Sequence, residues 1–271
     1  MQNMERCYRR LLFLLWRASL ILIFACGCQN HEDPSEKRES PKGPYSQKER
    51  KILEDFFHAL IYKNGFGYVL LGSKPSSFVV YEKILPKGNN WFDALCSLLP
   101  KNRIIKEGWE TWKKYGCVQS SFPLWEEPTS FSPNSFRIVI ANPQRLKEII
   151  EQCQDDFREV LKTKITEEDL LQHIPLFRDA LRNHEALMGL LLGYGRRNSW
   201  LFYEKNCLKK KNIVINSWKD PHPYLRLPAF KADLDHPETI HLRKVYEVDR
   251  VRILNYYEGK DFLEATIALL Q

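Results

Sequence analysis

FRIVIANPQRLKEIIEQCQDDFREVL, residues 136–161, decides the fold of this chain. It begins with an apolar run, Phe136 to Ala141, that is typical of a buried β-strand. Asn142 then offers the side-chain oxygen of an N-cap, and Pro143 suits the first helical position because proline has no N–H to bond. The helix that follows has one apolar face and one charged face. A strand that leads directly into an amphipathic helix predicts a mixed α+β domain.

Helices account for most of the remaining pattern. Asp235 and Asp261 each stand three residues before a carboxylate, and this spacing predicts acidic caps for the last two helices. The predicted helices cover 52–61, 91–99, 104–115, 186–203, 237–257 and 262–270.

Strands are few and short. Two runs of β-branched and aromatic residues, 68–71 and 78–81, flank a polar stretch and predict a hairpin. The stretch 120–134 holds three prolines and is expected to be loop. The predicted fold class is therefore α+β, a helix-dominated single domain with a small β-sheet.

The N-terminus has the three-part layout of a secretory signal peptide. Residues 1–10 are short and basic, residues 11–25 are mostly apolar, and small and thiol residues follow. The uncharged stretch 18–27 has ten residues, fewer than the ~20 that an α-helix needs to cross a membrane. A cleaved export signal is therefore expected rather than a membrane span in the mature protein.

The quartet that ends at Cys28 resembles the lipobox of bacterial lipoproteins, in which a cysteine after a small residue receives a diacylglyceryl group before cleavage. Gly27 is the small residue, although Ala25 stands where lipoboxes usually carry leucine. The quartet that ends at Cys26 is an alternative, with the bulky Phe24 inside it. The resemblance implies lipidation at Cys28, and two or more acyl chains such as palmitate give stable membrane anchoring. A plain signal peptide that releases a soluble protein remains the other interpretation.

Residues 29–50 are rich in Glu, Lys, Arg, Ser and Pro and contain no aliphatic side chain. Such a composition cannot bury a core, and a flexible coil of about 20 residues spans roughly 25 Å. The predicted organisation is a lipoprotein signal peptide at 1–27, a lipidated cysteine and flexible tether at 28–50, and a globular α+β domain at 51–271.

Four cysteines follow the tether, and export decides how they are interpreted. In an oxidising compartment they allow two disulfides in three pairings. The alternative is four buried free thiols that pack as small hydrophobic side chains, and the sequence leaves both open. None has the spacing of a zinc site. These residues are Cys96, Cys117, Cys153 and Cys207.

Composition and charge exclude some classes of partner. The 271 residues are 44% hydrophobic and carry a net charge of +7, of which the arginine-rich signal segment contributes +3. The remaining +4 is scattered, and Lys209–Lys211 is the one tight basic run, interpreted as a solvated turn. No nucleic-acid partner is predicted.

The catalytic motifs that the sequence approaches are incomplete. His184 begins a zinc-protease pattern, but Met188 occupies the place of the second histidine. Gly193 and Gly195 mimic a dinucleotide loop that lacks its third glycine and its leading strand. Gly189 and Gly193 more simply allow a neighbouring element to approach the backbone closely.

Other polar and aromatic groups are interpreted as structural. Ser73 and Lys74 are adjacent rather than separated by two residues as in penicillin-recognising enzymes, so we expect an ordinary turn. Arg196 and Arg197 are expected to form a polar helix end, and the tryptophans are expected to lie in the core. No catalytic, cofactor-binding or metal-binding residue is predicted.

Beyond the lipobox, the blocks Val69–Ser77 and Glu185–Phe202 resemble those of uncharacterised lipoproteins of chlamydiae and related intracellular bacteria. This resemblance covers most of the mature domain and implies the cell envelope but no activity. The function expected is a lipoprotein anchored to the inner or outer membrane that binds another protein or an envelope component without catalysis. The alternative is an anchored hydrolase or transferase whose site is assembled from distant residues. A deep cavity that holds titratable groups with shifted pKa values would favour the enzyme, and a broad apolar patch without a pocket would favour the binder.

Overall fold

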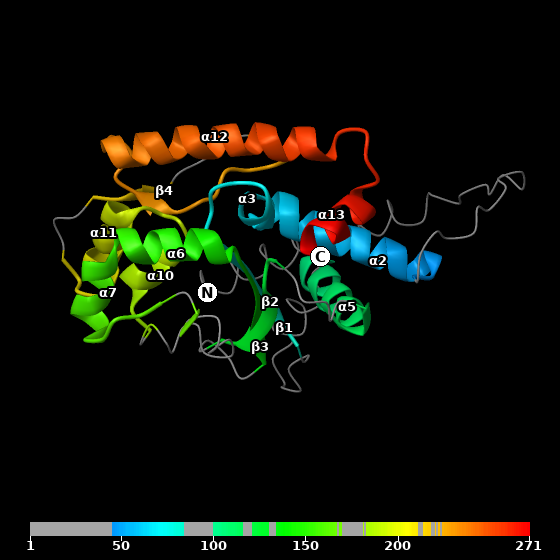
Figure 1. Ribbon diagram of the computed structural model, residues 1–271, viewed down its shortest axis with the longest axis horizontal. Coiled ribbons are helices and arrows are strands. Elements are labelled where there is room, and N and C mark those ends of the chain that lie inside the picture. Colours follow the sequence, from blue (N-terminus) through cyan, green and yellow to red (C-terminus); the bar gives the residue numbers. More distant parts are fainter. Residues whose placement is uncertain are drawn as a thin grey trace, which may run out of the picture. The chain divides into compact units, whose positions relative to one another are not determined.

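The described part of the chain contains helices, a three-stranded antiparallel sheet and a two-stranded pairing of β4 with β5 (Figure 1). The computed structural model describes residues 45–83, 100–115, 121–129, 134–166, 168–169, 181, 183–210, 214–217, 220, 222 and 224–271. The helices are α2 (Gln47–His58), the π-helical turn η1 (Ala59–Lys63), α3 (Phe66–Leu70), α5 (Pro100–Tyr115), α6 (Pro143–Gln152), α7 (Gln154–Leu161), α10 (Glu185–Leu191), α11 (Arg196–Asn206), α12 (Pro237–Tyr257) and α13 (Phe262–Leu270). The strands are β1 (Ser76–Glu82), β2 (Leu124–Pro128), β3 (Ser135–Ala141), β4 (Asn216–Ser217) and β5 (Lys231–Ala232). The predicted helix-dominated α+β class is confirmed.

The three-stranded sheet has the order β1-β3-β2 and separates two hydrophobic cores. Trp125 and Val139 face one side of the sheet, where they pack with the apolar sides of α6, α7 and α10. Val79 and Ile138 face the other side, where α2, α3, α5, α12 and α13 supply the partners. In Figure 1, α6, α7 and α10 lie on one side of the strands and α2, α5 and α13 on the other, while α12 runs along the top.

The segment 136–161 folds largely as its pattern indicates. Strand β3 covers the apolar run, Asn142 accepts a hydrogen bond from the backbone N–H of Arg145 at 3.1 Å, and Pro143 is the first residue of α6. The predicted single helix is nevertheless interrupted at Cys153, whose φ of −113° lies outside the helical range. No proline or glycine marks this break, so the apolar spacing alone could not reveal it.

Three predictions of local structure were wrong. The predicted helix 186–203 is divided into α10 and α11, because Gly193 and Gly195 between them have φ values of 74° and 82°. Residues 68–71 lie in and just after helix α3, which follows Gly65 at a φ of 76°. All five residues of α3 are buried, and an apolar run that is buried on every side carries no period to separate helix from strand. The predicted loop 120–134 contains strand β2, in which Pro128 occupies the last position of an edge strand.

The first helix begins earlier than the predicted end of the tether at residue 50. Helix α2 starts at Gln47, behind a capping box in which the side chains of Ser46 and Glu49 each accept from the other's backbone N–H at 3.2 Å. The capping box satisfies amide groups that an uncapped helix leaves unbonded, so the helix forms although its first turn has the polar composition of the tether.

Of the two acidic caps predicted for the last two helices, the cap of α13 is confirmed and the cap of α12 is wrong. Asp261 caps α13 through the N–H of Glu264 at 3.0 Å, as predicted. Helix α12 is capped by His236 rather than Asp235. Glu238 instead accepts hydrogen bonds at the first turn of the neighbouring helix α11, an arrangement that only the tertiary structure creates.

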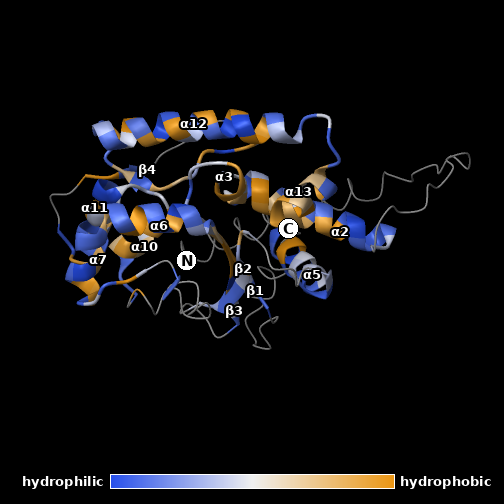
Figure 2. Ribbon diagram, in the orientation of Figure 1, coloured by the Kyte–Doolittle hydropathy of each residue, from blue (hydrophilic) through white to orange (hydrophobic). Residues whose placement is uncertain are grey.

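Helix α12 alternates between hydrophilic and hydrophobic residues along its length (Figure 2). Tyr246 and Ile253 are buried on its inner side, whereas Val248 and Val251 lie exposed on its outer side. None of the described helices is both long and apolar enough to cross a membrane.

Residues 45–271 form one compact unit of the chain. The predicted signal peptide, both candidate lipidation sites at Cys26 and Cys28, most of the tether and the predicted helix at 91–99 lie outside the described residues. Those features therefore stay predictions.

Candidate functional site

Strand β1 lies at an edge of the sheet. Along this strand, the backbone N–H and C=O groups of successive residues point alternately toward β3 and away from it. Two bonds of 2.8 Å frame its pairing with β3, from Lys83 N to Asn134 O and from Asn142 N to Pro75 O. In an antiparallel pair, hydrogen-bonded positions alternate with positions whose groups point away. The odd-numbered residues of β1 therefore bond β3, and the even-numbered residues turn their N–H and C=O outward.

Side chains close this outer edge at its two ends and leave its middle open. The backbone N–H and C=O of Glu82 bond the side chain of Asn102 at 2.7 and 3.3 Å. The C=O of Ser76 accepts a hydrogen bond from the side-chain ammonium of Lys74. Between them, the backbone groups of Phe78 and Val80 have no hydrogen-bond partner in the described part of the chain. Four backbone groups are thus available beside the strand.

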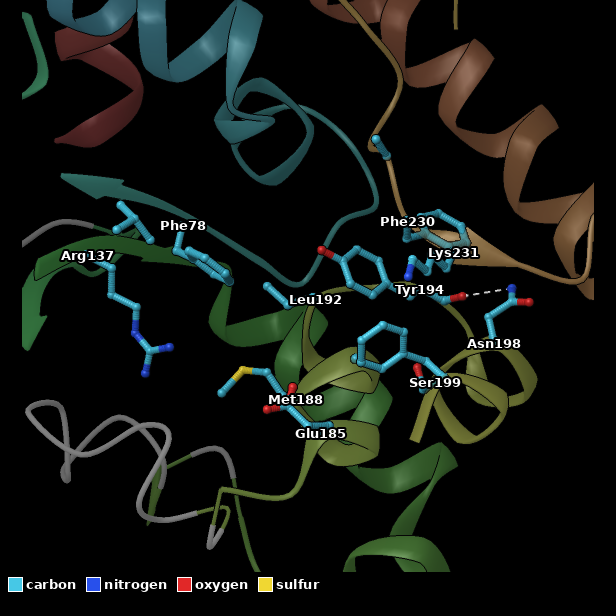
Figure 3. A pocket seen from close by; sticks show the side chains of 14 residues that line it. Phe78, Arg137, Glu185, Met188, Leu192, Tyr194, Asn198, Ser199, Phe230 and Lys231 are labelled. Atoms are coloured by element: carbon cyan, nitrogen blue, oxygen red, sulfur yellow. Dashed lines mark hydrogen bonds between the residues drawn. The ribbon is translucent and has the colours of Figure 1, made fainter. Parts of the chain in front are cut away.

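An apolar cavity of about 350 Å³ adjoins this open edge. In Figure 3, Phe78 comes from β1, Met188 and Leu192 come from α10 and its C-terminal end, and Phe230 comes from the segment before β5. The residues around the cavity are Phe78, Val80, Arg137, Glu185, Met188, Gly189, Leu192, Tyr194, Asn198, Ser199, Phe202, Ala229, Phe230 and Lys231. A concave, mostly apolar site with a few polar groups is the usual form of a ligand cavity.

A second, more polar cavity of about 790 Å³ continues along the same strand. It shares Phe78, Leu192, Tyr194 and Ala229 with the apolar cavity, and together they are called the β1 groove below. Its own lining residues are Lys63, Asn64, Gly65, Lys74, Ser77, Asp220, Arg226, Leu227 and Pro228. The groove is thus apolar at one end and predominantly basic at the other.

Lys74 is the most unusual residue of the β1 groove. Its side chain is 3% exposed, its Nζ donates to Ser76 O at 2.5 Å and lies 5.7 Å from the centre of the Tyr194 ring. Burial lowers the pKa of Lys74 to about 7 and raises that of Tyr194 to about 12. No carboxylate forms an ion pair with Lys74 among the residues that the structure describes, although buried cations usually have such a partner.

The turn that carries Lys74 is held from both sides. Ser73 donates to the buried carboxylate of Asp249 on α12 through its backbone N–H at 2.8 Å and through its hydroxyl at 2.6 Å. Gly72 lies so close that an added Cβ would be 2.7 Å from an oxygen of Asp249. On the other side, Gly193 has a φ of 74° and leaves room for the stem of Lys74. The Lys74 ammonium is thus fixed in place before any ligand arrives.

Two acidic groups near the groove, Asp220 and Glu127, are already paired. Although burial raises the pKa of Asp220, hydrogen bonds from Leu227 N and His222 N and the charge of Arg250 lower it to below its usual value. Glu127 is buried beside Arg137, its cross-strand neighbour in the sheet. By contrast, Lys63 and Arg226 form no ion pair with any described residue, which leaves the polar cavity with excess positive charge.

Several residues singled out in the sequence are structural. Gly189 and Gly193 allow close approach as predicted, since an added Cβ would be 2.6 Å from Ser199 Oγ and from Tyr246 Oη respectively. Arg196 clamps the carboxylate of Asp156 at 2.6 and 2.8 Å. Of the tryptophans predicted for the core, Trp109, Trp112 and Trp125 are buried, whereas Trp200 is only partly buried.

The other predicted site residues divide into two pairs. Cys153, which is buried, and Cys207, which is exposed, are both free thiols, so the structure contains no disulfide at either. Cys96 and Cys117 lie outside the described residues. Within the described ranges no cluster of three His, Cys, Asp or Glu side chains could hold a metal ion.

The sequence indicated the turn at Lys74 but not its burial, and it missed the groove. Phe78, Met188 and Phe230 come from three distant segments, and each looks like an ordinary core residue where it stands. The one usable signal was the glycine-rich stretch around Gly193 and Gly195, which does border the groove, although as a packing device rather than as a phosphate loop.

No model of a known protein family matches this chain, and neither a curated protein nor a solved structure does.

Proposed function

We propose that the chain is a lipoprotein anchored in the cell envelope and that its folded domain binds a ligand in the β1 groove without catalysing a reaction. The observation that carries this proposal is the union of an apolar and a basic cavity at Phe78, Leu192 and Tyr194. Such a groove suits a ligand with an apolar part and a negative charge. The lipobox resemblance at Cys28 supports the anchor.

Lys74 also favours the alternative, an anchored hydrolase or transferase, because a lysine with a pKa of about 7 can act as a base or a nucleophile at neutral pH. Catalysis of the serine–lysine kind further needs a hydroxyl that bonds the lysine. The hydroxyls of the two serines that follow Lys74 in β1 are instead bonded to backbone carbonyls, Ser76 to Leu191 at 2.7 Å and Ser77 to Asn64 at 2.9 Å. Binding is therefore the better-supported function of the two.

Groove binding can be tested with 1-anilinonaphthalene-8-sulfonate, a dye that joins an apolar ring system to a negative charge. We expect one molecule to bind the folded chain that starts at residue 28 and carries Cys28→Ala. In Met188→Trp the larger side chain fills the apolar cavity, and we expect the affinity for the dye to fall by about tenfold or more. Fluorescence titration measures both.

Leu208→Trp is the matched control, because Leu208 is exposed and outside the groove. Its affinity for the dye should equal that of the parent chain. If Met188→Trp binds the dye as tightly as the control does, the dye lies elsewhere and the groove loses its support as a ligand site. Circular dichroism spectra establish that each variant is folded.

The anchor has its own test, which is intact mass spectrometry of the protein purified from membranes. We expect a mass that lacks residues 1–27 and carries acyl chains, lost in Cys28→Ala and kept in Cys26→Ala. The reverse pattern would move the lipid to Cys26. An unlipidated chain that retains the apolar segment would contradict the lipoprotein assignment altogether.

A further inference from the structure

We propose that the β1 groove takes the C-terminal segment of another polypeptide, which adds to β1 as an antiparallel strand and places its terminal carboxylate beside Lys74. This inference rests on the proposed binding function and names the class of ligand. It stands on three independent features of the groove, which are its open backbone, its unpaired cation and the different character of its two cavities.

The open backbone calls for a ligand that has a backbone of its own. Phe78 and Val80 each present one N–H and one C=O to the groove, and the side chain of Asn102 already imitates a strand at Glu82. An extended peptide carries donors and acceptors at this same spacing, which is the basis of recognition by strand addition. An alkyl chain or a flat aromatic molecule could fill the apolar cavity but would leave these four groups without partners.

The unpaired ammonium of Lys74 can bind a carboxylate at one end of the added peptide strand. Lys74 Nζ bonds Ser76 O, which points outward from β1, so the ammonium lies beside the edge rather than above or below the sheet. An ammonium has three donors, and only the bond to Ser76 is formed within the described chain. A chain terminus continues the line of the peptide backbone, whereas an Asp or Glu side chain projects from one face. The C-terminal carboxylate therefore fits this position.

The position of Lys74 also sets the direction and register of the added strand. A carboxylate opposite Ser76, at the start of β1, makes the added strand antiparallel. Its last residue then lies opposite Ser76, its third-last residue opposite Phe78 and its fifth-last residue opposite Val80. Directly opposed side chains share a face of the sheet, so the third-last side chain points into the apolar cavity that Phe78 lines.

The second-last residue of the ligand projects to the other face, opposite Ser77. Ser77 lines the polar cavity together with Lys63 and Arg226, neither of which is in an ion pair with a described residue. We therefore expect an acidic side chain at this position and an aliphatic or aromatic one at the third-last position. A stretch of five residues is long enough to satisfy every feature named.

The experiment uses two pools of random acetylated hexapeptides, one with free C-terminal carboxylates and one with C-terminal amides. Each pool is passed over the immobilised chain that starts at residue 28 and carries Cys28→Ala, and bound peptides are identified by mass spectrometry. We expect free acids to be retained about tenfold more than amides, since the amide loses the charged hydrogen bond to Lys74. Retained peptides should carry an apolar third-last residue and an acidic second-last residue.

Two changes then separate the strand from the charge. N-methylation of the third-last residue of a retained peptide removes the N–H that bonds Phe78 O, and it should weaken binding by about tenfold. N-methylation of the second-last residue, whose N–H points away from β1, is the matched control and should cost less. In Lys74→Gln, acid and amide forms of the peptide should bind equally well.

Each other outcome overturns the inference. Equal retention of acids and amides would show that the groove does not bind the terminal carboxylate. Equal effects of the two N-methylations would show that the peptide does not add to β1 as a strand. If no peptide is retained while the anionic dye still binds and Met188→Trp still blocks it, the groove is a ligand site but not a peptide site. If neither dye nor peptide binds, the proposed function fails as well.

Discussion

Gly108→Ala is expected to lower the free energy of unfolding by at least about 2 kcal/mol. Gly108 lies in α5 where this helix crosses α2, and an added Cβ would stand 2.2 Å from Phe56 Cβ and 2.4 Å from its Cγ. Phe56 Cβ is bonded to the main chain, so no change of rotamer can move it away. The two helices would have to separate.

Separation of α2 from α5 would disturb a large part of one core. Phe56 and Ile105 are fully buried, and Phe57 meets Trp112 edge to face at 5.2 Å on the same contact. Alanine is the better helix former by about 1 kcal/mol, and this gain opposes the loss. A backbone-anchored clash in a close-packed core exceeds it, so the sign of the net effect is settled by packing.

Urea unfolding followed by circular dichroism and tryptophan fluorescence measures this loss. Gly259→Ala is the control, because an added Cβ there meets nothing within 4 Å and only the φ of 70° opposes the substitution. We expect it to cost about 1 kcal/mol. A loss in Gly108→Ala no larger than this would show that α2 and α5 can move apart freely.

Features that depend on neighbouring residues in the sequence were predictable. Asn142 with Pro143, and Asp261 with Glu264, identify helix starts because each cap is completed within one turn. The strand at 78–81 was likewise predictable, because this run consists of β-branched and aromatic residues. At the two helix starts, the hydrogen bond that forms the cap lies within the segment that predicts it.

Features that depend on distant partners were not predictable in this way. Strand β2 forms because Trp125 and Glu127 pair with Val139 and Arg137 of the neighbouring strand β3. The prolines of the stretch 120–134, taken alone, indicate a loop. The burial of Lys74 depends on Gly193 and on the fixed turn above it. The sequence around one side chain does not show which distant segment will cover it in the folded protein. The groove could therefore be found only in the structure.

The free energy of unfolding is expected to rise as the pH increases from 7 to 8.5, and this rise should disappear in Lys74→Met. The pKa of Lys74 is about 7 in the folded state against 10.5 for an unperturbed lysine. Between these values the unfolded chain binds one more proton than the folded chain, so each pH unit stabilises the fold by about 1.4 kcal/mol. The penalty of the buried charge is full below pH 7 and fades above it.

Other shifted groups act outside this window. Burial lowers the pKa values of His58 and His184 below 6.5, so their contributions are complete by about pH 7. Burial raises the pKa of the Cys153 thiol from 9.0 to about 11 and that of Tyr194 to about 12, so these groups reduce stability only at higher pH. Among the residues that the structure describes, the slope between pH 7 and 8.5 therefore belongs to Lys74.

Urea unfolding at pH 7 and 8.5 provides the measurement. We expect a gain of about 2 kcal/mol in the parent chain and none in Lys74→Met, which should also be the more stable protein at pH 7. Parallel slopes in the two proteins would mean that the Lys74 ammonium is hydrated after all, and the carboxylate site would lose its physical basis. The unpaired Lys74 ammonium, at the closed end of an otherwise open strand edge, destabilises the free protein. A bound anion pairs with this ammonium and removes the destabilisation, so the buried charge favours binding of an anion at this position.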